Sequence, residues 1–273
     1  MKKFITSITM LLMVFVLCFS FVGCSQTSYK AVKLTDANPE SYGFAVKKGE
    51  NANILAAVNK VIASEGFEAK VNELVEYYTA VYGDETPKAL SFELPNLEDN
   101  TAGTLKVGTE AGFAPFEFID SSKVVGLDMA IMQMVAEELN YKLEIKDMKF
   151  DTLPAALESG NIDIIAAGFT NNAERALSMD FSSNYFTSQQ FIVCEEGKTL
   201  EKLADLKDLK IGVQLGTTGN MLIADEIKAG SLGSAKCVEY QSITFAMQAL
   251  KKGDIDAIVI DELPAKSLVK ASK

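Results

Sequence analysis

Two pairs of internal repeats constrain the fold of this chain more than any other feature of its sequence. LKVGTEAG at residues 105–112 returns as LKIGVQLG at 209–216, and LESGNIDIIAAG at 157–168 returns as LKKGDIDAIVID at 250–261. Because the two motifs recur in the same order, they indicate two halves of similar structure. The chain has 273 residues, which is enough for two lobes of roughly 100–120 residues each.

Each half has the pattern of a small α/β unit. A short apolar strand is predicted at the start of each half, at 105–108 and 209–213, and a buried strand at its end, at 162–166 and 255–260. The closing strands are runs of Ile, Val and Ala without polar alternation, which is typical of parallel strands covered on both faces. Apolar residues at helical spacing predict a helix at 127–140. The sequence therefore predicts an α/β fold with two lobes, each built on a doubly wound sheet.

The topology of such a fold predicts where a ligand binds. In doubly wound sheets, ligands bind outside the carboxyl ends of the strands. This rule selects the loops at 109–115 and 168–175 in the first half, and those at 215–219 and 261–264 in the second. If the lobes face each other, these loops converge on one cleft. The sequence has no G-x-G-x-x-G pattern, so the lobes carry no dinucleotide signature.

Arg175, in the second of these loops, is the only arginine in the chain, and all other basic residues are lysines. A guanidinium presents a planar fork that matches both oxygens of a carboxylate, whereas lysine offers a point charge. Arg175 is therefore a candidate clamp for a ligand carboxylate. A long-range salt bridge, for example to Asp180, is the alternative, and the sequence leaves both open.

Four further residues near the predicted cleft have two interpretations each. Asp261 ends an apolar strand before a helix, so it is either a helix N-cap or an anion that receives a ligand ammonium. Thr217 is either a cap or a hydroxyl donor to an anion. Phe113 and Phe150 lie in turn-rich surroundings and either line the cleft or pack in the core. A cation at Arg175 and an anion at Asp261 would suit a zwitterion.

The composition excludes several classes of function. The formal net charge is −11 and no basic stripe with interleaved aromatic residues is present, which argues against nucleic acid as a partner. The absence of histidine removes the usual general base and the commonest metal ligand, so we predict no cofactor and no metal site. Cys194 and Cys237 fit neither a C-x-x-C nor a metal spacing. They are either a disulfide, which export would permit, or plain core residues.

Residues 1–24 have the pattern of an export signal. Lys2 and Lys3 precede an almost wholly apolar stretch from 4 to 22, and small residues precede Cys24. The pattern resembles a bacterial lipobox, in which Cys24 would become the lipidated N-terminus. An uncleaved signal anchor is the alternative, because the apolar stretch could just span a bilayer.

The motifs around the candidate residues carry a family resemblance. In chain order they are GTEAGFAPFEFID, VVGLDMA, FDTLPAALESGNIDIIAAGFTNNAER, MDFSSNYF, LADLKDLKIGVQLGTTGN and GDIDAIVIDELPA. Together they resemble the bacterial extracellular solute-binding proteins of family 3, the polar amino acid receptors of ABC importers. The resemblance covers nearly all of residues 104–273. It implies a two-lobed, type II fold like that of periplasmic binding proteins, with two doubly wound sheets joined by hinge strands.

The resemblance also implies a role for each candidate residue. Arg175 matches the arginine that clamps the ligand α-carboxylate, and Thr217 matches a threonine that assists it. Asp261 matches the aspartate that takes the α-ammonium. Phe113 and Phe150 match aromatic residues that sandwich the ligand side chain.

Five more positions match ligand-binding positions of the family. Gly168 and Thr170 match strand-end residues that bind polar groups of the ligand. Glu110 and Asp128 match positions that can line the side-chain pocket, and two carboxylates there favour a basic amino acid. Gln214 leaves glutamine or another polar amino acid open.

One departure from the family is topological. The family continues beyond the point that matches the end of this chain, whereas residues 30–78 resemble the family's missing tail, with YGFAVKKG at 42–49 as its returning hinge strand. The order therefore predicts a circular permutation, in which an exposed linker at 83–103 joins the family's usual C- and N-termini. The alternatives are a domain swap, in which 29–82 completes a neighbouring molecule, and a remnant of a tandem receptor gene.

The permuted order implies a domain organisation in which each lobe is built from two stretches of chain. These are a signal peptide at 1–24, lobe 2 at 25–45 and 190–273, lobe 1 at 46–82 and 104–189, and the linker at 83–103.

The function implied is that of a receptor without enzymatic activity. It would capture a polar, in particular a basic, amino acid between its lobes and deliver it to the membrane permease of an ABC importer. It would lie outside the cytoplasm, anchored to the membrane surface through the lipid on Cys24. The alternatives are a dehydratase on the same fold and an amino acid sensor that does not transport.

Overall fold

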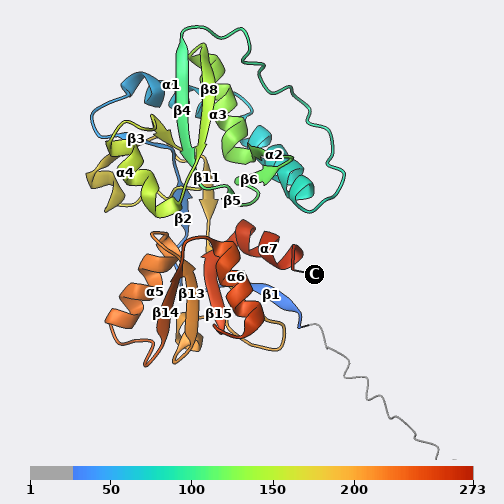
Figure 1. The fold of residues 1–273 in the computed structure, drawn as a ribbon, viewed down its shortest axis with the longest axis vertical. Coiled ribbons are helices and arrows are strands. Elements are labelled where there is room, and N and C mark those ends of the chain that lie inside the picture. The colour runs from blue at the N-terminus through green and yellow to red at the C-terminus, as the bar shows by residue number, and fades with distance from the viewer. Residues whose placement is uncertain (1–26, 273) are drawn as a thin grey trace, which may run out of the picture.

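The computed structural model describes residues 27–272 and consists of two lobes, one above the other in Figure 1. The predicted signal peptide and Cys24 lie outside the described residues. Each lobe has a five-stranded sheet with helices on both faces, and the sheets are joined by a pair of hinge strands. Both ends of the described chain belong to the lower lobe, lobe 2. Among residues 27–272, no helix has the length and apolar character needed to cross a bilayer.

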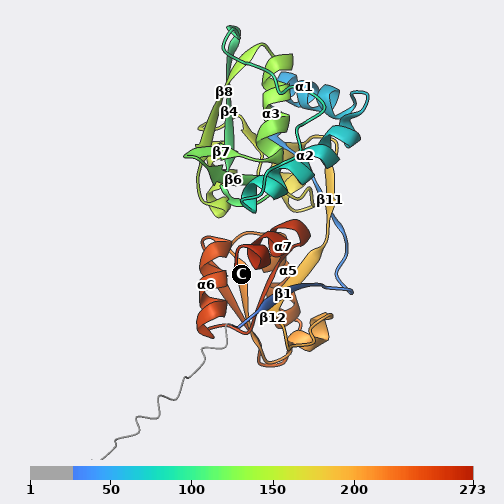
Figure 2. The same cartoon turned by 90° about the vertical axis from the view of Figure 1, so that its right-hand side faces the viewer.

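The upper lobe, lobe 1, is built on a sheet of strand order β10-β3-β9-β4-β8. The strands are β3 (Ala45–Lys47), β4 (Gly103–Thr109), β8 (Tyr141–Asp147), β9 (Ile164–Ile165) and β10 (Met179–Phe181). The helices are α1 (Ala52–Ile62), α2 (Phe67–Tyr82), α3 (Leu127–Glu138) and α4 (Leu153–Glu158), and a small sheet is formed by β5 (Gly112–Phe113), β6 (Glu117–Asp120) and β7 (Lys123–Val125). Figure 2 shows α1, α2 and α3 together on one face of the main sheet.

Lobe 2 has a sheet of strand order β1-β12-β15-β13-β14. The strands are β1 (Tyr29–Lys33), β12 (Gln190–Glu195), β13 (Lys210–Gln214), β14 (Lys236–Tyr240) and β15 (Ala257–Asp261). Its helices are α5 (Thr218–Lys228), α6 (Ile243–Lys252) and α7 (Glu262–Lys270). In Figure 1, α5 lies on one side of this sheet and α6 and α7 lie on the other.

The sequence repeats form equivalent strands of the two sheets, which confirms the predicted similarity of the two halves. The first motif forms β4 and β13, each the middle strand of a parallel trio. The second motif leads into β9 and β15, the neighbours of β4 and β13. Beyond them each sheet continues with two antiparallel strands, β3 and β10 in lobe 1 and β12 and β1 in lobe 2.

A packing contact explains why the two motifs recur together. A Cβ added at Gly108 of β4 would lie 2.3 Å from Cδ1 of Ile162, and one added at Gly212 of β13 would lie 2.4 Å from Cδ1 of Ile255. A larger residue at either glycine position would displace the isoleucine of the second motif. The glycine of one motif therefore makes room for the isoleucine of the other, in both lobes.

The aspartates of the second motif also have equivalent roles. The Asp163 carboxylate accepts a bond of 2.9 Å from the N–H of Lys106, and its own N–H donates to the Lys106 carbonyl at 2.8 Å. Asp256 and Lys210 repeat both bonds at the same distances. Because these side chains replace ladder bonds at the start of the strands, β9 and β15 begin later than the predicted strands at 162–166 and 255–260.

The N-terminal segment contributes to both lobes and to the hinge. From β1 in lobe 2, the chain passes through β2 (Glu40–Tyr42), which pairs antiparallel with β11 (Phe186–Ser188), and then enters β3 in lobe 1. The predicted single hinge strand at 42–49 is thus divided between β2 and β3. The division falls at Gly43, whose N–H donates to the carbonyl of Phe169 as the chain turns into lobe 1.

The segment 83–103 is irregular up to β4, as predicted, but it is not a freely exposed linker. Leu90, Phe92 and Leu94 are half-buried against the core, and the residues between them are exposed. Ser91 donates through its N–H and its hydroxyl to the two carboxylate oxygens of Glu73 in α2. This alternating pattern of buried and exposed residues holds the segment against α2 as it runs around lobe 1 in Figure 1.

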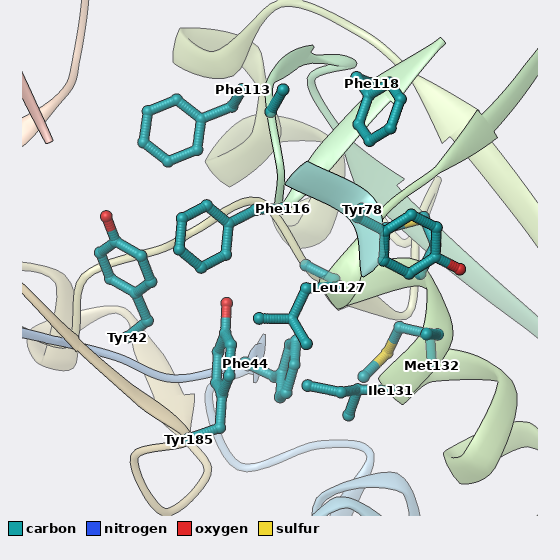
Figure 3. Packing of buried hydrophobic residues seen from close by; sticks show 14 of the residues in the cluster. Tyr42, Phe44, Tyr78, Phe113, Phe116, Phe118, Leu127, Ile131, Met132 and Tyr185 are labelled. Carbon is teal, nitrogen blue, oxygen red and sulfur yellow. The ribbon is translucent and has the colours of Figure 1, made fainter. Parts of the chain in front are cut away.

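The largest core extends through lobe 1 and reaches the hinge. In Figure 3, Phe44 stacks on Tyr185, with ring centroids 4.3 Å apart, beside Leu127 and Ile131 of α3. Tyr42 of the hinge strand is also fully buried there. The hinge is therefore anchored in the core of lobe 1. Elsewhere, Cys194 and Cys237 are both free, so the disulfide interpretation is wrong.

Candidate functional site

A narrow cavity of about 10 Å³ lies where the loops of the two lobes meet. Its wall comes from both lobes and consists of Phe113, Phe150, Gly168, Thr170, Arg175, Gln214, Thr217, Thr218 and Asp261. All but two of the predicted ligand residues belong to this wall. The two others, Glu110 and Asp128, are buried behind it.

Arg175 spans the boundary between the lobes. Its Nη1 donates to the carbonyl of Thr170 in lobe 1 at 2.9 Å, and its Nη2 donates to the carbonyl of Gly216 in lobe 2 at 3.0 Å. The guanidinium carbon lies 3.9 Å from the ring centroid of Phe169 and 5.6 Å from that of Phe150. The planar group is thus held by carbonyls at its edge and by aromatic rings at its face.

The charge of Arg175 has no ion-pair partner among residues 27–272. The predicted alternative, a salt bridge to Asp180, is wrong because Asp180 pairs with Lys48 at 2.9 Å. Burial lowers the pKa of Arg175 to about 10, and the nearby charges of Glu40 and Asp261 oppose that shift. The group therefore stays cationic at neutral pH and can accept a carboxylate from the cavity.

Asp261 presents a free oxygen on the same wall, from lobe 2. It ends β15 and is the N-cap residue of α7, but its side chain makes no cap bond and is therefore free for another partner. The side chain is buried, and although the hydroxyls of Tyr42 and Ser188 lie near it, its Oδ1 has no partner with good hydrogen-bond geometry. Burial, and then the neighbouring Glu40, raise the pKa of Asp261 well above its ordinary value. An ammonium ion in the cavity would satisfy this oxygen and lower the cost of ionising it.

Thr217 is a helix cap. Its hydroxyl accepts a bond of 3.2 Å from the N–H of Asn220 and donates to the carbonyl of Gln214 at 2.8 Å. The single hydroxyl proton is therefore used within the protein, although the residue lies on the cavity wall. The Nε2 of Gln214 lies on the same wall near the Glu110 carboxyl, but the two make no bond of good geometry, so this amide is a donor that a ligand can engage.

The aromatic residues of the wall restrict its shape. Phe113 and Phe150 are both buried and both line the cavity. Gly168 has a φ of +51°, and a Cβ there would lie 2.6 Å from Cε1 of Phe113. Glycine is required at this strand end because of both its backbone conformation and the close aromatic ring.

A second group of carboxyls, Glu110, Glu117 and Asp128, lies behind the wall in lobe 1 and is called here the lobe 1 acidic cluster. Asp128 accepts a bond of 2.6 Å from the hydroxyl of Tyr185 and one of 2.9 Å from the N–H of Gly168. Burial raises the pKa of Asp128 to about 7 and raises those of Glu110 and Glu117 as well. Asp128 therefore positions the strand end at Gly168 and does not itself line the cavity.

The sequence analysis missed Glu40. This residue of β2 accepts hydrogen bonds from the hydroxyls of Thr170 and Thr218, both of which line the cavity. The available signal was its place just before the segment at 42–49, because a charged residue that enters a hinge strand must pass next to the cleft. We treat Glu40 and Asp261, with Gln190 beside them, as the hinge cluster.

The arrangement of a cation, a free carboxylate oxygen and two rings around an enclosed cavity agrees with comparisons to known proteins. Residues 105–259 match the family described as bacterial extracellular solute-binding proteins, family 3. The chain belongs to this family. Membership implies a location outside the cytoplasm.

Individual members of the family show how far the similarity extends. The arginine-binding extracellular protein ArtP of Bacillus subtilis is 31% identical over 171 residues, which cover 62% of this chain and 65% of that protein. An ancestral arginine-binding protein, solved bound to arginine, is 40% identical with a TM-score of 0.59, over 62% of this chain and 74% of that one. The chain thus matches somewhat less than two thirds of the length of ArtP.

One structural neighbour bears on enzymatic activity. The ancestral amino acid-binding protein AncCDT-1, described as a precursor of cyclohexadienyl dehydratase, is 34% identical with a TM-score of 0.55. The similarity covers 62% of this chain and 75% of that one. The relatives named here are described as binding proteins, and these likenesses confirm the predicted type II fold.

Proposed function

We propose that this protein is a receptor that encloses an α-amino acid between its lobes and delivers it to the permease of an ABC importer. The observation that carries the proposal is the pair of uncompensated groups on one cavity wall, the Arg175 guanidinium and the Asp261 Oδ1. They lie on different lobes, so a zwitterion that engages both favours the closed form.

Each end of the ligand then has a defined partner. Arg175 takes the α-carboxylate through its free N–H groups while its other donors stay on the carbonyls of Thr170 and Gly216. Asp261 takes the α-ammonium. Phe113 and Phe150 cover the apolar part of the ligand side chain.

The ligand class that we propose is a polar amino acid, with arginine first and glutamine second. The lobe 1 acidic cluster lies behind the wall and favours a cationic side chain if it ionises on binding. The unpartnered Nε2 of Gln214 can bond a carbonyl or carboxylate oxygen of a neutral side chain. ArtP is named as an arginine-binding protein, and the ancestral arginine-binding protein has also been solved with glutamine.

A thermal-shift panel of the twenty amino acids with the purified 25–273 chain tests the receptor function. A ligand present at 100 times its Kd adds about 2.7 kcal/mol to the free energy of unfolding, which is a large shift for a domain of this size. If no amino acid raises the melting temperature, the receptor proposal fails. Incubation with prephenate tests the dehydratase alternative, for which the likeness to AncCDT-1 is the one favourable observation.

We also propose that the chain is a circular permutant anchored through Cys24. The family match begins at residue 105, whereas strands β1, β2 and β3 from outside that match complete lobe 2, the hinge and lobe 1. The segment at 83–103 would be the new connection between the two stretches of lobe 1. A monomeric mass for the ligand-bound protein supports permutation within one chain, and an obligate dimer supports a swap of 29–82. Labelling with radioactive palmitate that disappears in a Cys24→Ala variant tests the anchor.

A further inference from the structure

Glu40 connects the two lobes from the hinge side of the cavity. Its Oε2 accepts a bond of 2.6 Å from the hydroxyl of Thr170 in lobe 1 and another of 2.6 Å from the hydroxyl of Thr218 in lobe 2. Its Oε1 accepts a bond of 2.5 Å from Nε2 of Gln190 in β12. The carboxylate is thus held by donors from both lobes.

These bonds determine the direction of two hydroxyl protons. A carboxylate only accepts hydrogen bonds, and a threonine hydroxyl has a single proton to donate. Thr170 and Thr218 therefore direct their protons toward Glu40 and have only oxygen lone pairs to offer to the cavity that they line. Without Glu40, either hydroxyl could rotate and donate to a ligand carboxylate.

The hydrogen-bonding character of the hinge side of the wall follows from this arrangement. The free Oδ1 of Asp261 is an acceptor, and the hydroxyl oxygens of Thr170 and Thr218 are acceptors as well. A ligand ammonium has three N–H donors, which match an array of acceptors. A carboxylate in the same place would meet lone pairs and the negative charge of Glu40.

We propose that Glu40 is a specificity-determining residue that makes the hinge side of the cavity an acceptor surface and so selects ligands that carry an α-ammonium. It acts through Thr170 and Thr218, and is a positioning residue rather than a direct ligand contact. The inference rests on the proposed function, because it assigns a preference to the amino acid site. It concerns a residue of the N-terminal segment, outside the stretch that matches the family.

The test compares amino acids with analogues that lack only the α-ammonium. The probes are L-arginine with 5-guanidinopentanoate and L-glutamine with glutaramate, and the measured quantity is the ratio of Kd values within each pair by isothermal titration calorimetry. The variants are Glu40→Gln, Glu40→Asp and the control Glu50→Gln. Glu50 is an exposed residue of the same N-terminal segment, 3.0 Å from Lys47, and its replacement removes the same charge.

In Glu40→Gln the amide oxygen should stay opposite the Nε2 donor of Gln190, which places the amide NH2 at the former position of Oε2 and releases both threonine protons toward the cavity. The preference for the amino acid over its deaminated analogue should then fall by about tenfold, the value of one charge-assisted hydrogen bond. Glu40→Asp keeps the carboxylate and should restore much of the preference. Glu50→Gln should leave the preference unchanged.

A general weakening of the hinge would not mimic this result, because both members of a pair require the same closure. An unchanged ratio in Glu40→Gln, with binding retained, overturns the inference and leaves the receptor function standing. A ratio that falls equally in Glu40→Asp and Glu40→Gln assigns the effect to packing and also overturns it. If the wild-type protein binds neither amino acid nor any other in the panel, the receptor proposal itself fails.

Discussion

The hinge cluster and the lobe 1 acidic cluster each contain a buried aspartate, Asp261 and Asp128, yet these residues differ in what they offer to a ligand. Asp261 of the hinge cluster lies on the cavity wall with one oxygen unpartnered. Asp128 of the lobe 1 acidic cluster uses both oxygens, one on Tyr185 and one on Gly168. Burial and charge therefore do not by themselves identify a ligand contact, whereas a free acceptor on the wall does.

The two clusters also have different neighbouring charges. Asp261 lies near enough to Arg175 to oppose the lowering of its pKa, so a cation and an anion share the hinge side of the cavity. Glu117 and Asp128 have only other acids as charged neighbours, and burial raises the pKa of both. Burial raises the pKa of the aspartate in both clusters, but only Asp261 has a cation nearby that favours its ionised form when a ligand ammonium binds.

The sharpest test of this contrast compares Asp261→Asn with Asp128→Asn. Asp261→Asn removes the anion that faces the ligand ammonium and should weaken amino acid binding by about 100-fold or more, or roughly 3 kcal/mol. Asp128→Asn should weaken it by less than about tenfold, because the residue holds the strand end behind the wall. Isothermal titration calorimetry at pH 7 measures both. A larger effect of Asp128→Asn would contradict the assignment of Asp261, and not Asp128, as the ligand contact.

Arg175→Lys tests the cationic partner of Asp261. The lysine keeps the charge but cannot reach the Thr170 and Gly216 carbonyls and a ligand carboxylate together, so binding should weaken by about 2–3 kcal/mol. The same titrations measure it, and the melting temperature without ligand controls for folding. Near-normal affinity would mean that Arg175 holds the two lobes together and does not bind the ligand carboxylate.

The elements that could be predicted from the sequence are those whose packing residues recur in both halves of the chain. The glycine and isoleucine of the two motifs pack against each other in each lobe, so the recurrence of Gly108 with Ile162 and of Gly212 with Ile255 marked equivalent strands. The lone arginine likewise indicated the cavity, because every other basic residue of the chain is a lysine. In these cases a local pattern and a tertiary contact coincide.

The features that sequence did not predict depend on contacts between distant segments. Glu40 enters the site through bonds to Thr170 and Thr218, which are 130 and 178 positions away in the chain. The one local signal for Glu40 is its place just before the segment at 42–49, and that place does not reveal its partners. The packing of 83–103 was missed for a related reason. Its alternation of apolar residues was too short to indicate a strand, and its hydrogen-bond partners lie in α2 and α3.

The raised pKa of Asp128 predicts an effect of pH on stability. With a pKa of about 7 when folded and near 3.8 when unfolded, the carboxyl keeps a proton in the folded protein that the unfolded chain loses. The free energy of unfolding should therefore fall as pH rises through this range. Asparagine does not titrate, so the stability of Asp128→Asn relative to wild type should rise by about 2 kcal/mol between pH 5 and pH 8.

Urea unfolding of ligand-free protein at the two pH values measures this difference. Asp208→Asn is a matched control, because bonds from Ser234 lower the pKa of Asp208 and keep it ionised throughout this range. Its stability relative to wild type should stay constant from pH 5 to pH 8. A constant difference for Asp128→Asn as well would mean that Asp128 is already ionised in the folded protein and that burial does not hold its proton.

The smallest expected effect concerns ligand selectivity and Glu110. This carboxyl is buried behind the wall with its Oε2 unpartnered, and burial raises its pKa. If it ionises when a cationic side chain enters, Glu110→Gln should lower the preference for arginine over glutamine by about fivefold, or roughly 1 kcal/mol. Glu144→Gln, at a half-exposed position on β8, is the control for charge removed from the same lobe.

A second test of Glu110 uses pH. Because a raised pKa means that acid neutralises the group, the wild-type preference for arginine should also shrink as the pH falls from 8 to 6, and it should do so less in Glu110→Gln. A preference that neither pH nor the substitution changes would leave glutamine as good a ligand as arginine and would assign the lobe 1 acidic cluster to the folding of lobe 1 alone.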